Sequence, residues 1–481
     1  MSFNSFEFLI FLPVVFLLYW FVFRTRRLQN ILILVASYVF YGWWDWRFLF
    51  LIAATSLSSF CSGLLLERYE GRPRWRKVIS GSNIIFNLGI LGTFKYYNFF
   101  VENLDALLRA TLGYHLDWVT LKIILPVGIS FYTFQALSYS IDVYRRQLRA
   151  TRDIVEFFAY ISFFPQLVAG PIERATNLLP QFQRVRYFDR SKAVDGLRQM
   201  LWGFTKKMVI ADSCAAVVNE HWNEYADLNG LSLFVLATLF SFQIYCDFSG
   251  YSDIAIGCAR LFGFNLMRNF NYPYFSRSIP EFWRRWHISL MSWFRDYVYF
   301  PLGGSRCSKW KTIRNIYIVW AISGLWHAAN WTYICWGFFH ATLLTIYLLL
   351  GINTKYKENV GHGRILPNVK EVSQIVLTFF LVIISRVFSR SENIQQAYGF
   401  MRHMFLSAFD GFNLPFGKIL LLYGAALLIV EWFQREKQHA LQFPDIRPFR
   451  YRWVRWTVYY ILLVLIAQKL GNEQTFIYFQ F

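Results

Sequence analysis

Charged residues are scarce in this sequence. Only 16% of its 481 residues are charged, whereas 56% are hydrophobic and 21% are aromatic. A soluble domain carries roughly 25% charged residues, so the composition argues against a water-soluble enzyme. The aromatic content also excludes a disordered chain, because disordered chains are poor in aromatic and β-branched residues.

Cysteine is also rare. The six cysteines are scattered along the chain, and no two of them have the C-x-x-C spacing of a zinc ligand pair. The sequence therefore predicts neither a disulfide framework nor a zinc site.

The charge that is present is strongly basic, with 49 Lys and Arg against 29 Asp and Glu. The basic residues form short clusters between long apolar stretches, which is typical of the cytoplasmic loops of a polytopic membrane protein. We therefore expect the chain to lie in a lipid bilayer and to bind no nucleic acid. The predicted fold class is all-α, a polytopic integral membrane protein that forms a single membrane-embedded domain over residues 1–481.

A membrane span needs about 20 mainly apolar residues. We expect about ten to twelve transmembrane helices, together with re-entrant or interfacial helices. The first candidate lacks a basic segment before it and is too long for a signal-peptide core, so we expect it to be retained. The candidates are residues 6–23, 30–46, 47–66, 78–95, 121–141, 199–218, 231–247, 313–331, 332–351, 371–389, 416–432 and 456–470.

The basic clusters also predict an orientation. Placing the clusters in the cytoplasm puts Met1 and the C-terminus outside the cell membrane, which requires an even number of crossings. The protein is expected in the inner (cytoplasmic) membrane. The clusters lie at residues 24–27, 72–77, 145–146, 184–192 and 447–455.

Two segments do not fit simple spans. Residues 153–171 contain Pro165, Gly170 and Pro171, which favours a re-entrant or surface element. Residues 321–351, with the turns before them, would make a helix of roughly 54 Å, almost twice the membrane thickness. We therefore predict a break at Ala329 and Asn330.

Three of the eight histidines, His287, His327 and His340, lie in apolar, aromatic-rich sequence. An ionisable group at membrane depth is costly to keep and indicates a functional site. We expect the remaining histidines to be solvated surface residues, namely His115, His221, His362, His403 and His439.

Residues 282–296 are predicted to form one helix. Arg285, Ser289, Ser292 and Asp296 would form a polar stripe along it, and His287 would face the opposite way. His287 then faces an enclosed aromatic cavity inside the protein. A histidine that is only hydrogen-bonded in the core is the alternative.

The second histidine lies in the segment GLWHAANW, residues 324–331. If this segment is helical, Gly324, Asn330 and Trp331 share the face of His327, where Gly324 leaves room beside the ring and Asn330 orients it. Trp326 and Asn330 are candidates for supporting the histidine or binding the substrate. A neutral imidazole can take a proton from an alcohol, which suits His327 as a general base. His340 is turned away and is expected to pack behind the site. A metal site of the three histidines has little support, because no i,i+4 pair or nearby carboxylate accompanies them.

Two carboxylates, Asp247 and Asp253, lie within apolar sequence at residues 245–253. The spacing is not that of an EF-hand calcium loop. Hydrogen bonds to neighbouring arginines are the favoured role.

Several segments together resemble the membrane-bound O-acyltransferase family, over nearly the whole chain. The similarity is strongest to the bacterial branch that includes the membrane subunits of alginate and peptidoglycan O-acetylation, and weaker to teichoic-acid D-alanylation. Ala328 is a minor departure, since a glycine is usual there. The segments are LPVGISFYTFQ (125–135), FPQLVAGPI (164–172), YCDFSGYSD (245–253), FWRRWHISLMSWFRDYVYFPLGG (282–304) and GLWHAANW (324–331).

The resemblance implies that His327 is the catalytic histidine and that His287 is the second polar residue of the site. It also implies helices around a thin central tunnel, in which a cytoplasmic acyl donor meets an outside acceptor. Residues 476–481 match a terminal F-x-Y-x-x-F pattern of this branch, which implies Tyr478 as an acyl carrier at the outer face. An interfacial aromatic belt is the alternative for this motif.

The first functional hypothesis is an acyltransferase that uses acetyl-CoA, or another acyl thioester, as donor substrate and binds no cofactor. Its partners would be an extracytoplasmic hydrolase-like acetyltransferase and, downstream, a polysaccharide such as an alginate-type exopolysaccharide or peptidoglycan. Arg284, Arg285, Lys309 and Lys311 would attract the phosphates of coenzyme A, or serve only as topology markers.

The second hypothesis is a multi-span transporter that exports an acyl or glycan unit, with the histidines relaying protons. Acylation of a lipid or of a secreted protein shares the chemistry of the first hypothesis and differs in the acceptor.

Overall fold

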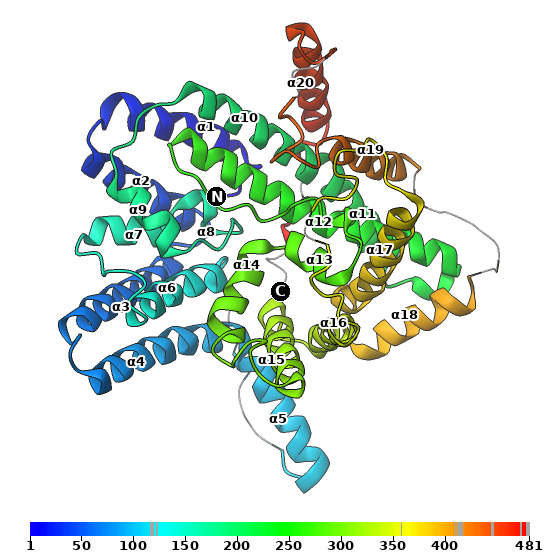
Figure 1. The fold of residues 1–481 in the computed structure, drawn as a ribbon, viewed down its shortest axis with the longest axis horizontal. Helices are drawn as coiled ribbons and strands as arrows, with labels where there is room; N and C mark the ends of the chain where they lie inside the picture. The colour runs from blue at the N-terminus through cyan, green and yellow to red at the C-terminus, as the bar shows by residue number, and fades with distance from the viewer. Residues whose placement is uncertain are drawn as a thin grey trace. The chain divides into compact units, whose positions relative to one another are not determined.

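The fold consists of helices joined by connections of varied length (Figure 1). The computed structural model describes residues 1–115, 120–121, 124–356, 358–408, 410, 416, 418–443, 447–471 and 474–477. Within these residues no β-strand occurs, which confirms the predicted all-α class. The chain forms two compact units, one of Met1–Ala193 with Cys258–Met267 and one of Val194–Gly257 with Arg268–Phe481.

The first unit contains the helices of the N-terminal part of the chain. In it, α3, α4 and α6 pack against one another. Helix α10 leads from this unit into the second. The helices are α1 (Phe6–Leu17), α2 (Arg26–Gly42), α3 (Leu49–Arg68), α4 (Pro73–Leu91), α5 (Tyr97–Leu112), α6 (Ile129–Tyr144), α7 (Ile154–Ser162), α8 (Phe164–Leu167), α9 (Ala175–Gln183) and α10 (Arg190–Phe204).

Basic clusters share one end of this unit. The guanidinium group of Arg76 donates to the carbonyl of Leu66 at 2.7 Å and to that of Tyr144 at 2.6 Å. Because α3 and α6 end at this point and α4 begins here, the clusters at residues 72–77 and 145–146 lie together. The side of the membrane on which these clusters lie stays a prediction.

The segment at residues 153–171 is a broken helix. Helix α7 ends at Ser162 and α8 begins at Phe164, with Phe163 in a non-helical conformation between them. Phe163 and Phe164 are fully buried, so the surface alternative is wrong. The aromatic side chains of the two phenylalanines explain this burial, because exposing them to water would cost more free energy than a surface turn would gain. A re-entrant path through the bilayer stays a prediction.

The second unit carries the histidine-rich segments. The last residues of its long helix α12 belong to the first unit. Helix α20 projects from the second unit (Figure 1), and none of its residues is buried. The helices are α11 (Asp212–His221), α12 (Gly230–Leu261), α13 (Ile279–Arg285), α14 (Ile288–Phe294), α15 (Lys309–His327), α16 (Trp331–Leu349), α17 (Val369–Arg390), α18 (Ile394–Leu406), α19 (Ile419–Phe433) and α20 (Arg452–Ala467).

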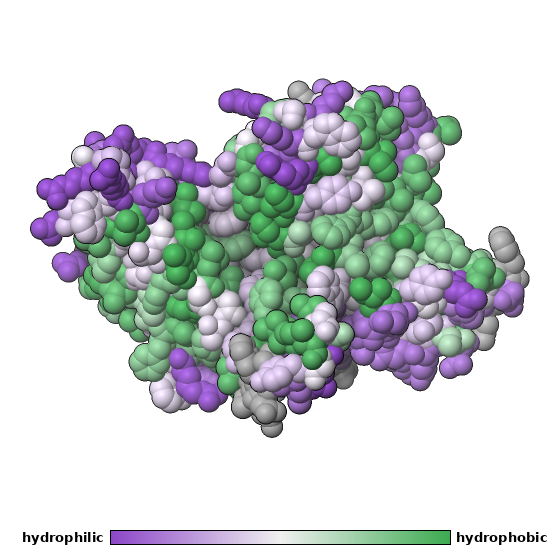
Figure 2. Space-filling model, turned by 90° about the horizontal axis from the view of Figure 1, so that it is seen from below, coloured by the Kyte–Doolittle hydropathy of each residue, from purple (hydrophilic) through white to green (hydrophobic). Residues whose placement is uncertain are grey.

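Among the described residues, 4 helices are long and apolar enough to cross a membrane, at Trp46–Arg68, Gly230–Leu261, Trp331–Leu349 and Val369–Arg390. A helix forms at each of the other predicted stretches as well, including the shorter Phe6–Val22 and Ile419–Phe433. Figure 2 shows apolar residues over broad areas of one face, with hydrophilic residues gathered in clusters. The number of crossings stays a prediction.

The predicted break between residues 321 and 351 is confirmed. Helix α15 ends at His327 and α16 begins at Trp331. The two helices pack closely because glycines face the partner backbone: a Cβ on Gly324 would lie 2.3 Å from the carbonyl oxygen of Tyr333, and one on Gly337 would lie 2.4 Å from that of Trp320. The close packing fixes His327 at the turn between them.

Candidate active site

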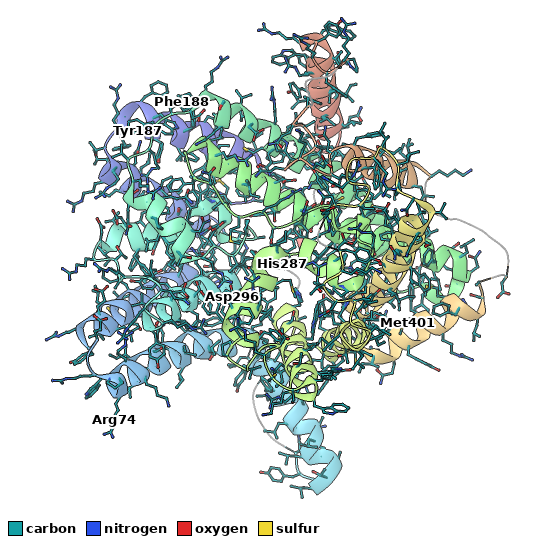
Figure 3. All side chains as sticks on the ribbon, viewed as in Figure 1. Arg74, Tyr187, Phe188, His287, Asp296 and Met401 are labelled. Atoms are coloured by element: carbon teal, nitrogen blue, oxygen red, sulfur yellow. The ribbon has the colours of Figure 1, made fainter. Side chains whose placement is uncertain are left out.

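The prediction of one helix over residues 282–296 is wrong. The chain forms α13 and α14 instead, with Trp286 extended and His287 in the left-handed region at φ 47° and ψ 51°. A polar stripe along one helix therefore does not exist. Figure 3 shows His287 at this break.

The break is held by a segment that lies before it in the chain. The backbone N–H of Ile288 donates to the carbonyl of Asn269 at 2.9 Å, and the N–H of Asn271 donates to the carbonyl of Arg285 at 2.9 Å. A left-handed residue other than glycine costs about 1–2 kcal/mol. These bonds offset that cost, because they satisfy backbone groups that a continuous helix would have used.

The side chain of Asn269 strengthens the same connection. Its carbonyl oxygen accepts from the hydroxyl of Ser289 at 2.9 Å, and its amide donates to the hydroxyl of Ser252 at 3.2 Å. Asn269 is fully buried. Asn269 therefore links α12 to α14, the helix that begins directly after His287.

His287 and His327 come together in the second unit, with their ring centroids 6.4 Å apart. Both are buried, with 1% and 8% of their surface exposed. Trp326 lies 4.8 Å from the ring of His327 and 5.9 Å from that of His287, and Phe248 meets His287 edge-on at 4.6 Å. The predicted aromatic surroundings of His287 are confirmed.

Burial also sets the protonation of His287, which lies outside the long apolar helices. Desolvation lowers the pKa of its imidazole from 6.5 to about 3. His287 is therefore neutral at physiological pH, with one ring nitrogen as a donor and the other as an acceptor.

His340 packs behind the site, as predicted. The indole N–H of Trp283 donates to its Nδ1 at 3.2 Å. Trp336 separates it from His327, with its ring centroid 5.1 Å from each imidazole. Among the described residues, no group of three or more His, Cys, Asp or Glu is placed to hold a metal ion.

The predicted role of Asn330 is wrong. Its side-chain oxygen accepts from the N–H of Thr332 at 2.9 Å, and its amide donates to the carbonyl of Glu392 at 2.8 Å. Because α15 ends at His327, no helical face joins the two residues. Asn330 caps the first turn of α16, the usual role of asparagine at this position.

Arg284 and Arg285 hold a neighbouring loop. Arg284 donates to the carbonyls of Asn353 and Tyr356, at 3.0 and 2.5 Å. Arg285 is buried and pairs with Glu281 at 2.9 Å. Lys309 and Lys311, at the start of α15, are exposed. An attraction of coenzyme A phosphates to any of the four stays a prediction.

Asp247 and Asp253 bind lysines, so the expected arginine partners are wrong. Lys207 lies 2.8 Å from Asp247, and the adjacent Lys206 lies 2.6 Å from Asp253. The sequence contained a signal for these lysines, since two cations stood inside the apolar stretch 199–218.

The expectation for His439 is also wrong, because it is buried with its Nε2 3.1 Å from Asp195.

The C-terminal segment reaches the same region. The backbone N–H of Ile477 donates to Asp247 at 2.8 Å. The ring of Phe476 lies 4.9 Å from Tyr251 and 6.1 Å from Phe248. Tyr478, the predicted acyl carrier, lies outside the described residues.

Comparison with known proteins decides the family. The model of the membrane-bound O-acyltransferase family matches residues 145–387, which include both site histidines. The chain belongs to the membrane-bound O-acyltransferase family. It is thus a multi-pass membrane enzyme that transfers acyl groups, as the resemblance implied.

Relatives of this O-acyltransferase are bacterial. It is 42% identical to the probable alginate O-acetylase AlgI of Pseudomonas aeruginosa over 408 residues, which cover 84% of this chain and 74% of that protein. It is 30% identical to the peptidoglycan O-acetyltransferase of Helicobacter pylori, over 82% of this chain and 77% of that one. It is 29% identical to the teichoic acid D-alanyltransferase of Bacillus subtilis, over 48% of this chain and 61% of that one.

Proposed function

We propose that this enzyme transfers an acetyl group from cytoplasmic acetyl-CoA across the inner membrane, for O-acetylation of an extracytoplasmic polysaccharide. The observation that carries the proposal is the pair of buried imidazoles, 6.4 Å apart at two helix ends and walled by aromatic rings. Such walls keep water from the thioester, whose hydrolysis would waste the donor.

In the proposed reaction, His327 removes the proton of the incoming hydroxyl as its oxygen attacks the thioester carbonyl. The neutral His287 donates a hydrogen bond to the oxyanion that develops. Collapse of this intermediate breaks the carbon–sulfur bond, and the leaving thiolate takes up the proton to give free coenzyme A. Donor and acceptor reach the two histidines from opposite faces of the membrane through a short tunnel.

The acceptor in this proposal is Tyr478. Its acyl ester would be handed to an extracytoplasmic hydrolase-like partner, which esterifies the polysaccharide. The names of the relatives favour an alginate-type exopolysaccharide or peptidoglycan as the final acceptor. Both termini are proposed to lie outside, because the basic clusters mark the cytoplasmic ends of the helices.

The experiment uses the full chain in proteoliposomes with isotope-labelled acetyl-CoA. We expect label on the C-terminal peptide at Tyr478, and a loss of about 100- to 10,000-fold in the rate for His327→Ala. His340→Ala is the matched control, since it removes a buried imidazole behind the site. Absence of label in the unaltered protein would exclude Tyr478 as acceptor. Full activity of His327→Gln, with a changed pH dependence, would favour the transporter.

A further inference from the structure

Two adjacent lysines are buried at the end of α10. They belong to a π-helical turn at Thr205–Ala211, and Lys206 and Lys207 are 3% and 4% exposed. Neighbouring residues of a helix point about 100° apart, so each lysine reaches a different partner. Lys206 pairs with Asp253, whereas Lys207 pairs with both Asp212 and Asp247, at 2.7 and 2.8 Å.

Glycines allow this pairing. A Cβ on Gly203 would lie 2.6 Å from the carbonyl oxygen of Gly250, and one on Gly250 would lie 2.7 Å from that of Gly203. The backbones of α12 and of the segment before the lysines therefore touch. At such a distance a short aspartate on α12 can reach a lysine on the facing turn.

Lys207 and Asp247 also hold the C-terminal segment. The ammonium group of Lys207 donates to the carbonyl of Gln474 at 3.0 Å, and Asp247 accepts from the N–H of Ile477 at 2.8 Å. The pair thus binds both ends of residues 474–477. Phe476 and Ile477 are buried, with 4% and 2% of their surface exposed.

The held segment adjoins the catalytic pair. Phe476 lies 6.1 Å from Phe248, and Phe248 lies 4.6 Å from His287. A buried ion pair adds little to stability, because desolvation of both charges offsets their attraction. A pair that also binds two backbone groups of a distant segment fixes the place of that segment.

We propose that Lys207 and Asp247 are positioning residues, which hold the C-terminal segment 474–477 beside His287 for acyl transfer. The docking of the segment stands on the contacts alone. Its part in the reaction rests on the proposed function, in which the residue after Ile477 accepts the acyl group.

The first measurement tests docking in the full-length protein. Ile477→Cys places a thiol at a buried position, and mass spectrometry of its peptide follows the reaction with a maleimide. The clamp variant, Lys207→Met with Asp212→Asn and Asp247→Asn, removes the lysine together with both of its carboxylate partners, so that no buried charge is left unpaired. We expect it to react at least about tenfold faster, because undocking exposes the thiol.

The matched control is Lys206→Met with Asp253→Asn in the same Ile477→Cys background. It removes the neighbouring pair, whose ammonium group also bonds to Ser249 at 2.9 Å. The clamp variant and this control are compared by thermal unfolding and size-exclusion profile. Slow labelling in the control and fast labelling in the clamp variant support the proposal, whereas equal rates overturn it.

The second measurement follows acyl transfer without the Ile477→Cys change. We expect the clamp variant to lower the single-turnover rate of acetyl transfer at saturating acetyl-CoA by about 10- to 100-fold, because a misplaced acceptor loses its alignment with the donor. The acetyl-CoA concentration that gives half of the maximal rate stays unchanged. Lys207→Arg alone keeps the positive charge and retains more of the rate than the clamp variant. An undocked segment with an unchanged single-turnover rate overturns the positioning role. If the segment undocks in the clamp variant but His327→Ala keeps full activity, the proposed function is contradicted, whereas the docking of the segment by Lys207 and Asp247 is still supported.

Discussion

At the scale of single residues, the site depends on His287 in a left-handed conformation. The sequence indicated that this histidine was functional, because it stood in an apolar segment. It could not indicate the break, since no glycine or proline lies between Phe282 and Asp296. The break is imposed by pairing with Asn269, and local sequence patterns carry no information on such distant contacts.

Replacement of Asn269 by alanine should therefore disturb the site. We expect Asn269→Ala to lower the acyl-transfer rate by about 10- to 100-fold, because His287 shifts when the bonds to Ser289 and Ser252 are lost. It should also lower the free energy of unfolding by about 1–3 kcal/mol. Initial rates and thermal unfolding of the purified protein measure the two effects.

Asn315→Ala is the control for that variant. Asn315 is fully buried and donates to the carbonyls of Leu302 and Gly304, both at 3.1 Å. The Asn315→Ala variant should lose about as much stability as Asn269→Ala and keep the acyl-transfer rate of the unaltered protein. A similar loss of rate in both variants would show that Asn269 has no specific effect on His287.

The pKa of His287 predicts an effect of pH on stability. Its pKa is lowered to about 3 in the folded protein, against 6.5 in the unfolded chain. The unfolded chain therefore binds more protons below pH 6.5, and the stability contributed by His287 falls as the pH falls. Between pH 7 and pH 5 this amounts to about 2 kcal/mol.

His287→Asn removes this titration and suits the left-handed conformation, which asparagine tolerates. We expect its unfolding temperature to depend less on pH, between pH 7 and pH 5, than that of the unaltered protein. Parallel curves for the two proteins would mean that the imidazole of His287 binds protons equally in the folded and unfolded chains, as a solvated side chain would.

At the scale of elements, apolar length predicted most of the helices and the break after His327. The physical reason is simple: a helix longer than the bilayer must bend, break or leave it. The partners of the helices were not predicted. Lys207 and Asp247 are far apart in the sequence, and nothing in either segment indicates the other.

The contact of α15 with α16 yields a prediction at this scale. Gly337→Ala would place a Cβ 2.4 Å from the carbonyl oxygen of Trp320, so the two helices must separate. We expect a loss of about 1–3 kcal/mol in stability from overpacking. The rate should fall as well, because His327 lies at the end of α15.

Gly81→Ala in α4 is the matched substitution, since a Cβ at that position meets nothing within 4 Å. It should be neutral or slightly stabilising, as alanine favours helix more than glycine does. Thermal unfolding and transfer rates of both variants decide the matter. An unaltered Gly337→Ala protein would contradict the close packing.

At the scale of the whole molecule, composition was sufficient to predict a polytopic helical membrane protein. The predicted orientation rests on the basic clusters, two of which lie together where Arg76 joins the ends of α3 and α6. Figure 3 shows Arg74 projecting from the start of α4.

Thiol labelling in whole cells tests the orientation. We expect a membrane-impermeant maleimide to label Ser2→Cys in intact cells, because the predicted orientation puts the N-terminus outside. Arg74→Cys should react only after the cells are permeabilised. The reverse pattern would invert the topology, and with it the direction of acyl transfer.

If Tyr478 accepts the acyl group as proposed, the hydrogen bonds that join the side chains of Lys207 and Asp247 to the backbone of residues 474–477 have a stoichiometric consequence. A nucleophile delivered by a segment of the same polypeptide is present once per catalytic centre, whatever the amount of enzyme. Each molecule could then load a single acetyl group and would stall until that group is collected. Turnover in the cell would be set by whatever unloads the tail, and an isolated preparation would yield one equivalent of product.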